Sequence, residues 1–157
     1  MDIRAATADD AREVVRLARM MFEAMGIDAS GPAWQLEGER HVRQRLGLDL
    51  AVFVAAHPED ADRLVASAAG TIAARLPGPR NGAGRVGYVQ WVSTEPDFRR
   101  RGLGRRLMES LLAWYGANDV ANVELHATPD GEPLYRSLGF SDAGARALRR
   151  GAWPLPG

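Results

Sequence analysis

Residues 96–107 read Pro-Asp-Phe-Arg-Arg-Arg-Gly-Leu-Gly-Arg-Arg-Leu, which places two glycines and five arginines within twelve positions. Upstream, residues 87–94 are rich in aromatic and β-branched side chains and end shortly before Pro96, so they predict a strand that stops there. Downstream, apolar side chains recur every fourth residue from Leu103 to Tyr115, and Gly116 follows, which predicts an amphipathic helix. The segment therefore connects a strand to a helix.

This connecting segment has the properties of a phosphate-binding site. A helix N-terminus leaves its first backbone N–H groups without partners, and the helix dipole favours negative charge there. Gly102 and Gly104 would let a phosphate approach these groups closely, and the arginines would add charge-assisted hydrogen bonds. Two common phosphate motifs do not fit, because a P-loop needs Lys and then Ser or Thr where Arg105 and Arg106 stand, and a dinucleotide fingerprint needs a small residue at Leu107. We interpret the segment as a pyrophosphate cradle.

The pattern Arg99-x-x-Gly102-x-Gly104 resembles the R/Q-x-x-G-x-G/A segment by which the GNAT (Gcn5-related N-acetyltransferase) superfamily holds the pyrophosphate of acetyl-coenzyme A. In that family a further strand follows the helix, and a short helix then carries a tyrosine four residues before Gly-Phe. Here residues 120–127 predict the strand, and Tyr135 precedes a Gly-Phe pair by four residues. Gly139 itself predicts the end of the short helix. The resemblance is close from about residue 87 to residue 140 and only architectural before that.

The resemblance implies an α/β architecture, the GNAT fold, with a mixed, mostly antiparallel central sheet of six to seven strands flanked by about four helices. At 157 residues, we expect a single GNAT acetyltransferase domain over residues 1–157, with a loosely ordered tail at about 151–157. Periodicity before residue 87 predicts a strand at 3–6, a helix between Thr7 and Gly26, a helix at 33–46, and paired strands at 51–56 and 64–75. Residues 145–150 fit either a last strand or a helix.

The resemblance also implies a cofactor site and one catalytic side chain. The residues that would bind acetyl-CoA are Val92, Ser93, Thr94, Arg99, Arg100, Arg101, Gly102, Leu103, Gly104 and Arg105. At least two of the five arginines in the segment should nevertheless face away from a phosphate. A backbone N–H near Val92 would stabilise the negative charge that develops on the thioester carbonyl. Tyr135 would protonate the leaving thiolate, since a phenol is a neutral donor at pH 7.

The implied activity is transfer of an acetyl group from acetyl-CoA to a primary amine by direct attack in a ternary complex. A small-molecule amine is the acceptor that we expect first, and a protein N-terminus is an alternative. A second class of function is a non-catalytic domain that binds acetyl-CoA as a sensor or partner module. A nucleic-acid role would rest only on the cluster of arginines.

The general base is not evident from the sequence. Many relatives place a glutamate on the strand before the cradle, but this chain has Gln90 and Trp91 there, and an amide cannot accept a proton at neutral pH. Four candidates stay open, and each is more often a surface or edge residue than a catalyst: Glu37, Glu39, Glu95 and His126. The residues that could line the acceptor pocket are Phe22, Met25, Trp34, Gln35 and Trp91.

Composition narrows the chemistry further. The chain has no cysteine, which excludes an acyl-cysteine relay and thiolate metal sites, and its three scattered histidines predict no metal. The formal net charge is zero, and no apolar run approaches a membrane-spanning length. We expect a cytoplasmic protein that binds neither nucleic acid nor membrane, with a homodimer as the default oligomer of the superfamily.

Overall fold

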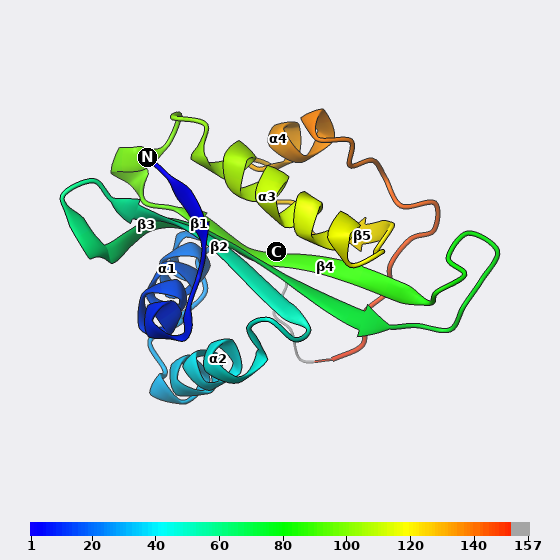
Figure 1. Ribbon diagram of the computed structural model, residues 1–157, viewed down its shortest axis with the longest axis horizontal. Helices are drawn as coiled ribbons and strands as arrows, with labels where there is room; N and C mark the ends of the chain where they lie inside the picture. Colours follow the sequence, from blue (N-terminus) through cyan, green and yellow to red (C-terminus); the bar gives the residue numbers. More distant parts are fainter. Residues whose placement is uncertain (152–157) are drawn as a thin grey trace. The chain divides into compact units, whose positions relative to one another are not determined.

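The computed structural model describes residues 1–151, which fall into two compact units, residues 1–126 and the residues from Ala127 on. The first unit contains, in chain order, β1 (Ile3–Ala5), the 3-10 turn η1 (Ala8–Asp10), α1 (Ala11–Ala24), α2 (Pro32–Arg45), β2 (Leu50–His57), β3 (Asp60–Ala74), β4 (Arg85–Thr94), the 3-10 turn η2 (Pro96–Phe98), α3 (Leu103–Ala117) and β5 (Asn122–Glu124) (Figure 1). The second unit contains α4 (Glu132–Ser137). The expectation of a single domain over residues 1–157 stays a prediction, and the predicted tail lies almost wholly outside the described residues.

The sheet has the strand order β1-β2-β3-β4-β5, in which neighbours are antiparallel except for the parallel pair β4 and β5. The mostly antiparallel α/β architecture with four helices is confirmed. The described residues form five strands, however, where we expected six to seven. Residues 145–150 are neither strand nor helix, because they carry one large apolar side chain, Leu148, which is 92% exposed and gives the segment no face to bury.

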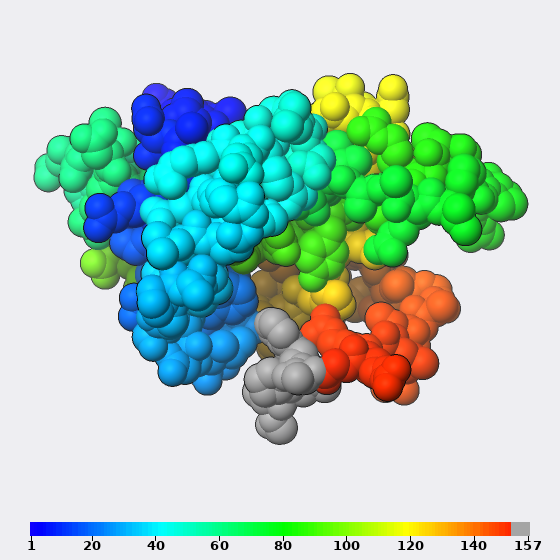
Figure 2. Space-filling view, turned by 90° about the horizontal axis from the view of Figure 1, so that it is seen from below, coloured from blue at the N-terminus to red at the C-terminus, as the bar shows by residue number. Residues whose placement is uncertain are grey.

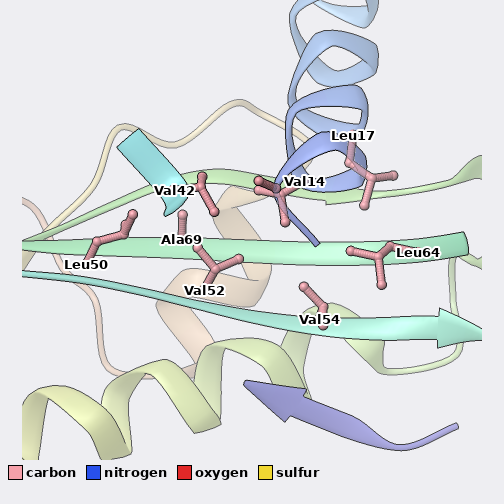
Figure 3. Close-up of a cluster of buried hydrophobic side chains, with 9 residues drawn as sticks. Val14, Leu17, Val42, Leu50, Val52, Val54, Leu64 and Ala69 are labelled. Carbon is pink, nitrogen blue, oxygen red and sulfur yellow. The ribbon is translucent and has the colours of Figure 1, made fainter. Parts of the chain in front are cut away.

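One face of the sheet is covered by α1 and α2 (Figure 1). The apolar face predicted for the first helix is real, since Val14 and Leu17 are fully buried there. Figure 3 shows these two side chains of α1 packed with Val42 of α2 against side chains of β2 and β3. In the space-filling view, α2 and the residues that lead into β2, in cyan, lie beside α1 in blue (Figure 2). The first two helices are therefore held to the sheet by one hydrophobic core.

The opposite face of the sheet is covered by α3. The largest buried side chain of α3 is Tyr115, whose hydroxyl shares its one proton between the carbonyls of Thr71 and Tyr88, each at 3.1 Å. Its ring lies directly on Gly87, where a Cβ atom would approach within 2.7 Å of Cζ, and close to Gly70 on β3. Two glycines in neighbouring strands thus make room for one aromatic ring, and this contact fixes α3 across the sheet.

Within the second unit, α4 begins after Gly131, carries Pro133 near its N-terminus and ends before Gly139, whose φ is +96°. The backbone N–H of Phe140 donates to the carbonyl of Tyr135 at 3.1 Å. The helix stop predicted at Gly139 is therefore confirmed, since glycine adopts this left-handed conformation without strain.

Candidate active site

The strand that leads into the cradle carries an irregularity at Trp91. Ser93 pairs with Ser67 and Gln90 pairs with Ala69, so Trp91 and Val92 together face the single residue Ala68. Trp91 also has a φ of +56°, which is uncommon for a bulky residue. An extra residue of this kind bends a strand and takes backbone groups out of the ladder. This geometry supports the prediction that a backbone N–H near Val92 is available to a ligand.

The parallel strands β4 and β5 separate before β4 ends. Their register contains three pairs, and the last joins Tyr88 to Glu124. β4 continues to Thr94, whereas β5 stops at Glu124, which is much shorter than the strand predicted at 120–127. The edge of β4 between Val89 and Thr94 therefore has no β5 partner, and the two strands open toward the cradle.

The cradle itself is a short loop between η2 and α3. Phe98 at its start and Leu103 at its end are buried and anchor it to the body of the unit. Arg100 and Gly102 both have positive φ, at +62° and +75°, and Gly102 is the N-cap residue of α3. Among residues 1–151, no side chain caps α3, and its first turn contains no acidic residue. The first N–H groups of the helix are thus left for a ligand, and an anion is the ligand that they favour.

The arginine side chains of the segment differ in their surroundings. Arg101 lies 4.8 Å from the centroid of the Phe98 ring and donates to the carbonyl of Asp97 at 3.2 Å, and Arg106 donates to the carbonyl of Met1 at 2.5 Å. Arg99 donates to the carbonyl of Thr94 at 3.1 Å, and Arg105 lies 4.0 Å from Glu109. Arg101 and Arg106 also border a hollow of about 680 Å³ whose other lining residues are Met1, Asp2, Arg4, Ala56, His57, Pro58 and Leu103.

The side chain of Ser93 has a structural role. It is buried, and its hydroxyl donates to the carbonyl of Leu17 on α1 at 3.0 Å. Any part that Ser93 takes in cofactor binding would therefore come from its backbone. The same distinction applies to Gly102, Leu103 and Gly104, because the helix N-terminus acts through main-chain N–H groups.

Tyr135 belongs to the second unit, where its half-buried ring packs edge-on against Phe140 at a centroid distance of 6.0 Å. Burial raises the pKa of its phenol above the ordinary value of 10.0, so the hydroxyl stays protonated and can donate at neutral pH. Its role as the proton donor to the thiolate stays a prediction.

Two of the four candidate bases are engaged in strong ion pairs. Glu95 is buried, and its carboxylate accepts hydrogen bonds from Arg16 at 2.9 Å and from Arg63 at 2.6 Å. Glu37 pairs with Arg40 and with His41, and the hydrogen bond from Arg40 is the main cause that lowers the pKa of Glu37 to about 2. Glu37 is therefore a poor proton acceptor for an ammonium group, and both carboxylate oxygens of Glu95 are already bonded to arginines.

The other two candidates differ from each other. Glu39 is half-buried on α2, and its carboxylate lies 3.8 Å from the guanidinium of Arg43. His126 is exposed, and its Nδ1 lies 2.6 Å from the hydroxyl of Tyr88. Sequence reasoning named His126 but missed Tyr88. The alternation of strand residues could have found it, because Tyr88 lies on the same side of β4 as Gln90.

Three of the predicted acceptor-side residues form an aromatic cluster on the face covered by α1 and α2. Trp34 contacts Phe22 edge-on at a centroid distance of 5.6 Å and Trp91 at 6.2 Å. Gln35 is held next to this cluster by hydrogen bonds of 3.1 Å to the carbonyls of Ala29 and Gly31. Met25, by contrast, is 37% exposed and lies just beyond the end of α1.

The comparisons with known proteins identify the family. The sequence model of the acetyltransferase (GNAT) family matches residues 14–140. The chain belongs to this family. A GCN5-related N-acetyltransferase from Ralstonia eutropha has the same fold, with a TM-score of 0.80, 26% identity and coverage of 95% of this chain and 97% of that structure. The expectation of a GNAT enzyme is thereby confirmed at the level of the family.

Two further solved structures share the fold at lower identity. A predicted acetyltransferase from Clostridium acetobutylicum, crystallised with acetyl-CoA, matches with a TM-score of 0.83, 23% identity and 95% coverage of both chains. A ribosomal-protein-alanine N-acetyltransferase from Brucella melitensis matches with a TM-score of 0.72, 21% identity and coverage of 96% and 100%. At these identities the likeness concerns the fold alone.

One curated relative, the [ribosomal protein bS18]-alanine N-acetyltransferase of Salmonella typhimurium, is 36% identical over 66 residues. The match covers 40% of this chain and 43% of the relative, so it spans less than half the length of either protein.

No helix within residues 1–151 is both long and apolar enough to cross a membrane. The same residues contain no group of three or more His, Asp or Glu side chains placed to hold a metal ion.

Proposed function

We propose that this protein transfers the acetyl group of acetyl-coenzyme A to a primary amine. The observation that carries the proposal is the N-terminus of α3, where Gly102 adopts a left-handed conformation and no described side chain caps the helix. Acetyl-CoA is the cosubstrate of the GNAT family, and its diphosphate is the anion that such a helix N-terminus favours. The separation of β4 from β5 leaves an unpaired strand edge beside the cradle for the arm of the cofactor.

The transfer proceeds by direct attack of the amine on the thioester within a ternary complex. A cysteine-bound acyl intermediate is excluded, since none of the 157 residues is a cysteine. A backbone N–H near Val92, at the irregularity of β4, stabilises the charge on the carbonyl oxygen. The phenol of Tyr135 donates a proton to the departing thiolate.

A small-molecule amine is the acceptor that we propose first. The aromatic cluster of Phe22, Trp34 and Trp91 offers apolar contact area to the body of a modest-sized molecule. Glu37 is paired with Arg40, so the cluster has little acidic charge to select a strongly cationic acceptor.

A protein N-terminus is the second candidate acceptor. It is favoured by the relative from Salmonella, which is 36% identical over its matched segment and acts on the alanine of a ribosomal protein. Cytoplasmic location and a homodimeric state stay predictions.

Release of free thiol from acetyl-CoA tests the proposal and separates the acceptors. The panel contains small primary amines and short peptides with a free N-terminal alanine. We expect thiol release with small amines, and lines that intersect in initial-velocity plots against both substrates. Preference for the peptides would favour the second candidate, parallel lines would contradict direct attack, and acetyl-CoA binding without turnover would favour a sensor.

A further inference from the structure

The point where β4 and β5 separate carries a pair of titratable side chains. Tyr88 belongs to the last register pair of the two strands, and His126 follows the end of β5 by two residues. The hydroxyl of Tyr88 lies 2.6 Å from Nδ1 of His126, and their rings are 5.7 Å apart with an angle of 59° between the planes. This short hydrogen bond joins two strands at the position where their backbones no longer pair.

The pair lies on the side of the sheet that faces the proposed acceptor. Gly87 contacts Tyr115 of α3, and side chains alternate along a strand, so Tyr88 points away from α3. Trp91 lies on that other side as well, since it contacts Trp34 and lies beside Gly38 of α2. Gln90, which takes the place of a strand glutamate, cannot accept a proton.

We propose that Tyr88 and His126 are the proton-accepting pair of the acetyl transfer, an inference that rests on the proposed function. The Tyr88 hydroxyl contacts the acceptor ammonium. One N–H bond of the ammonium breaks as an O–H bond forms at Tyr88, and the O–H bond that Tyr88 held breaks as an N–H bond forms at Nδ1 of His126. The result is a neutral amine, an unchanged phenol and an imidazolium.

The protons and charges of the whole reaction balance in this scheme. His126 is exposed, so its imidazolium returns the proton from Nδ1 to water and regains the tautomer that can accept from Tyr88. The acceptor nitrogen loses a second proton when the amide forms, and the thiolate of coenzyme A gains one proton, so these two changes balance.

Within residues 1–151, Glu124 and Tyr115 are titratable groups that adjoin the pair. Glu124 pairs with Tyr88 in the register of the parallel strands, so its side chain lies on the same face. Tyr115 donates to the Tyr88 carbonyl from the α3 side, and burial raises the pKa of its phenol far above the neutral range. Glu124 is therefore the neighbouring group whose contribution must be separated from that of His126.

The test is the pH dependence of kcat/KM for thiol release by the full chain and its variants, using the best amine of the panel. The wild type should lose activity toward acidic pH, as the accepting imidazole becomes protonated. Both His126→Gln and Tyr88→Phe should lower kcat/KM at pH 7 by about 10²-fold and should remove the loss of activity at acidic pH. The affinity for acetyl-CoA should be retained. His41→Gln, the same change on α2 where His41 pairs with Glu37, should leave the profile unchanged.

Three outcomes would overturn this assignment. A His126→Gln variant with the wild-type rate and the wild-type pH dependence of kcat/KM would remove the pair from the mechanism. The same would follow if the loss of activity at acidic pH disappeared only in Glu124→Gln. A wild-type protein that binds acetyl-CoA but releases no thiol with any amine would overturn the proposed function and the pair together.

Discussion

Among single residues, Tyr135 has the most specific predicted role. Its phenol is kept neutral by burial, and its ring packs against Phe140. A Tyr135→Phe variant retains that packing and removes only the O–H donor. We expect kcat to fall by about 10²-fold with an unchanged dissociation constant for acetyl-CoA, measured by thiol release and by calorimetry.

A matched variant, Phe140→Leu, disturbs the packing but keeps the phenol, and should retain most of the activity. Equal kcat for Tyr135→Phe and the wild type would remove the assignment of Tyr135 as the proton donor.

Gly87 is a second residue whose effect can be stated from contacts. A Cβ at this position would lie 2.7 Å from Cζ and 2.9 Å from Cδ1 of Tyr115, atoms of a fully buried ring. Gly87→Ala should therefore lower the free energy of unfolding by about 1–3 kcal/mol in a urea titration. The control is Gly116→Ala in the same helix as Tyr115, because a Cβ on Gly116 meets nothing within 4 Å.

Gly116→Ala should be neutral or stabilising by up to about 1 kcal/mol, as expected for alanine in a helix. If Gly87→Ala were no less stable than Gly116→Ala, the ring of Tyr115 could not lie on the strand as described.

On the level of elements, the N-terminus of α3 is the feature on which cofactor binding depends. Gly104→Glu adds bulk and negative charge in its first turn, where an acidic side chain favours the helix itself. We expect the fold to remain and the affinity for acetyl-CoA to fall by at least about tenfold, because the carboxylate competes with the diphosphate. Calorimetry of the variant against the wild type gives the measurement.

The matched control places the same substitution at the other end of the helix, as Gly116→Glu, and should retain wild-type affinity. Unchanged affinity of Gly104→Glu would mean that the phosphates bind elsewhere.

The turn η1 ties the start of α1 to β1 through one carboxylate. Asp10 is buried, and its oxygens accept hydrogen bonds from Arg4 at 2.7 and 2.9 Å and from the backbone N–H of Thr7 at 2.8 Å. The hydrogen bonds from Arg4 are the main cause that lowers the pKa of Asp10 below its ordinary value of 3.8. A depressed folded-state pKa stabilises the protein above the unfolded value, and this stability is lost as the pH falls through the folded value.

Asp10→Asn should therefore be less stable than the wild type by about 1 kcal/mol at pH 7, and the difference should shrink as the pH falls below 3.8. Urea titrations at several pH values measure both free energies, with the exposed neighbour Asp9→Asn as the control. A difference that stayed constant down to pH 2 would contradict the assigned role of the Asp10 carboxylate.

For the whole molecule, the sequence predicted those features that depend on local chemistry. The pattern of residues 96–107 located the loop between β4 and α3, and the periodicity from Leu103 to Tyr115 located α3 within a few residues. Glycine at position 139 correctly marked the end of α4. These features need only a few neighbouring residues, which a single sequence displays.

Features that depend on contacts between distant residues were not predictable. Glu95 is a candidate base on sequence grounds because it adjoins the cradle, but its partners Arg16 and Arg63 come from α1 and β3. The pairing of Tyr88 with His126 joins residues 38 positions apart. The length of β5 was overestimated, because apolar periodicity does not reveal where a neighbouring strand diverges.

A crystal structure of the full chain with coenzyme A bound is the most direct test of the central claim. We predict that the diphosphate lies within hydrogen-bond distance of the main-chain N–H groups of residues 102–104, at the N-terminus of α3. A diphosphate bound elsewhere, with these N–H groups facing water, would contradict the account of both the cradle and the acetyl transfer.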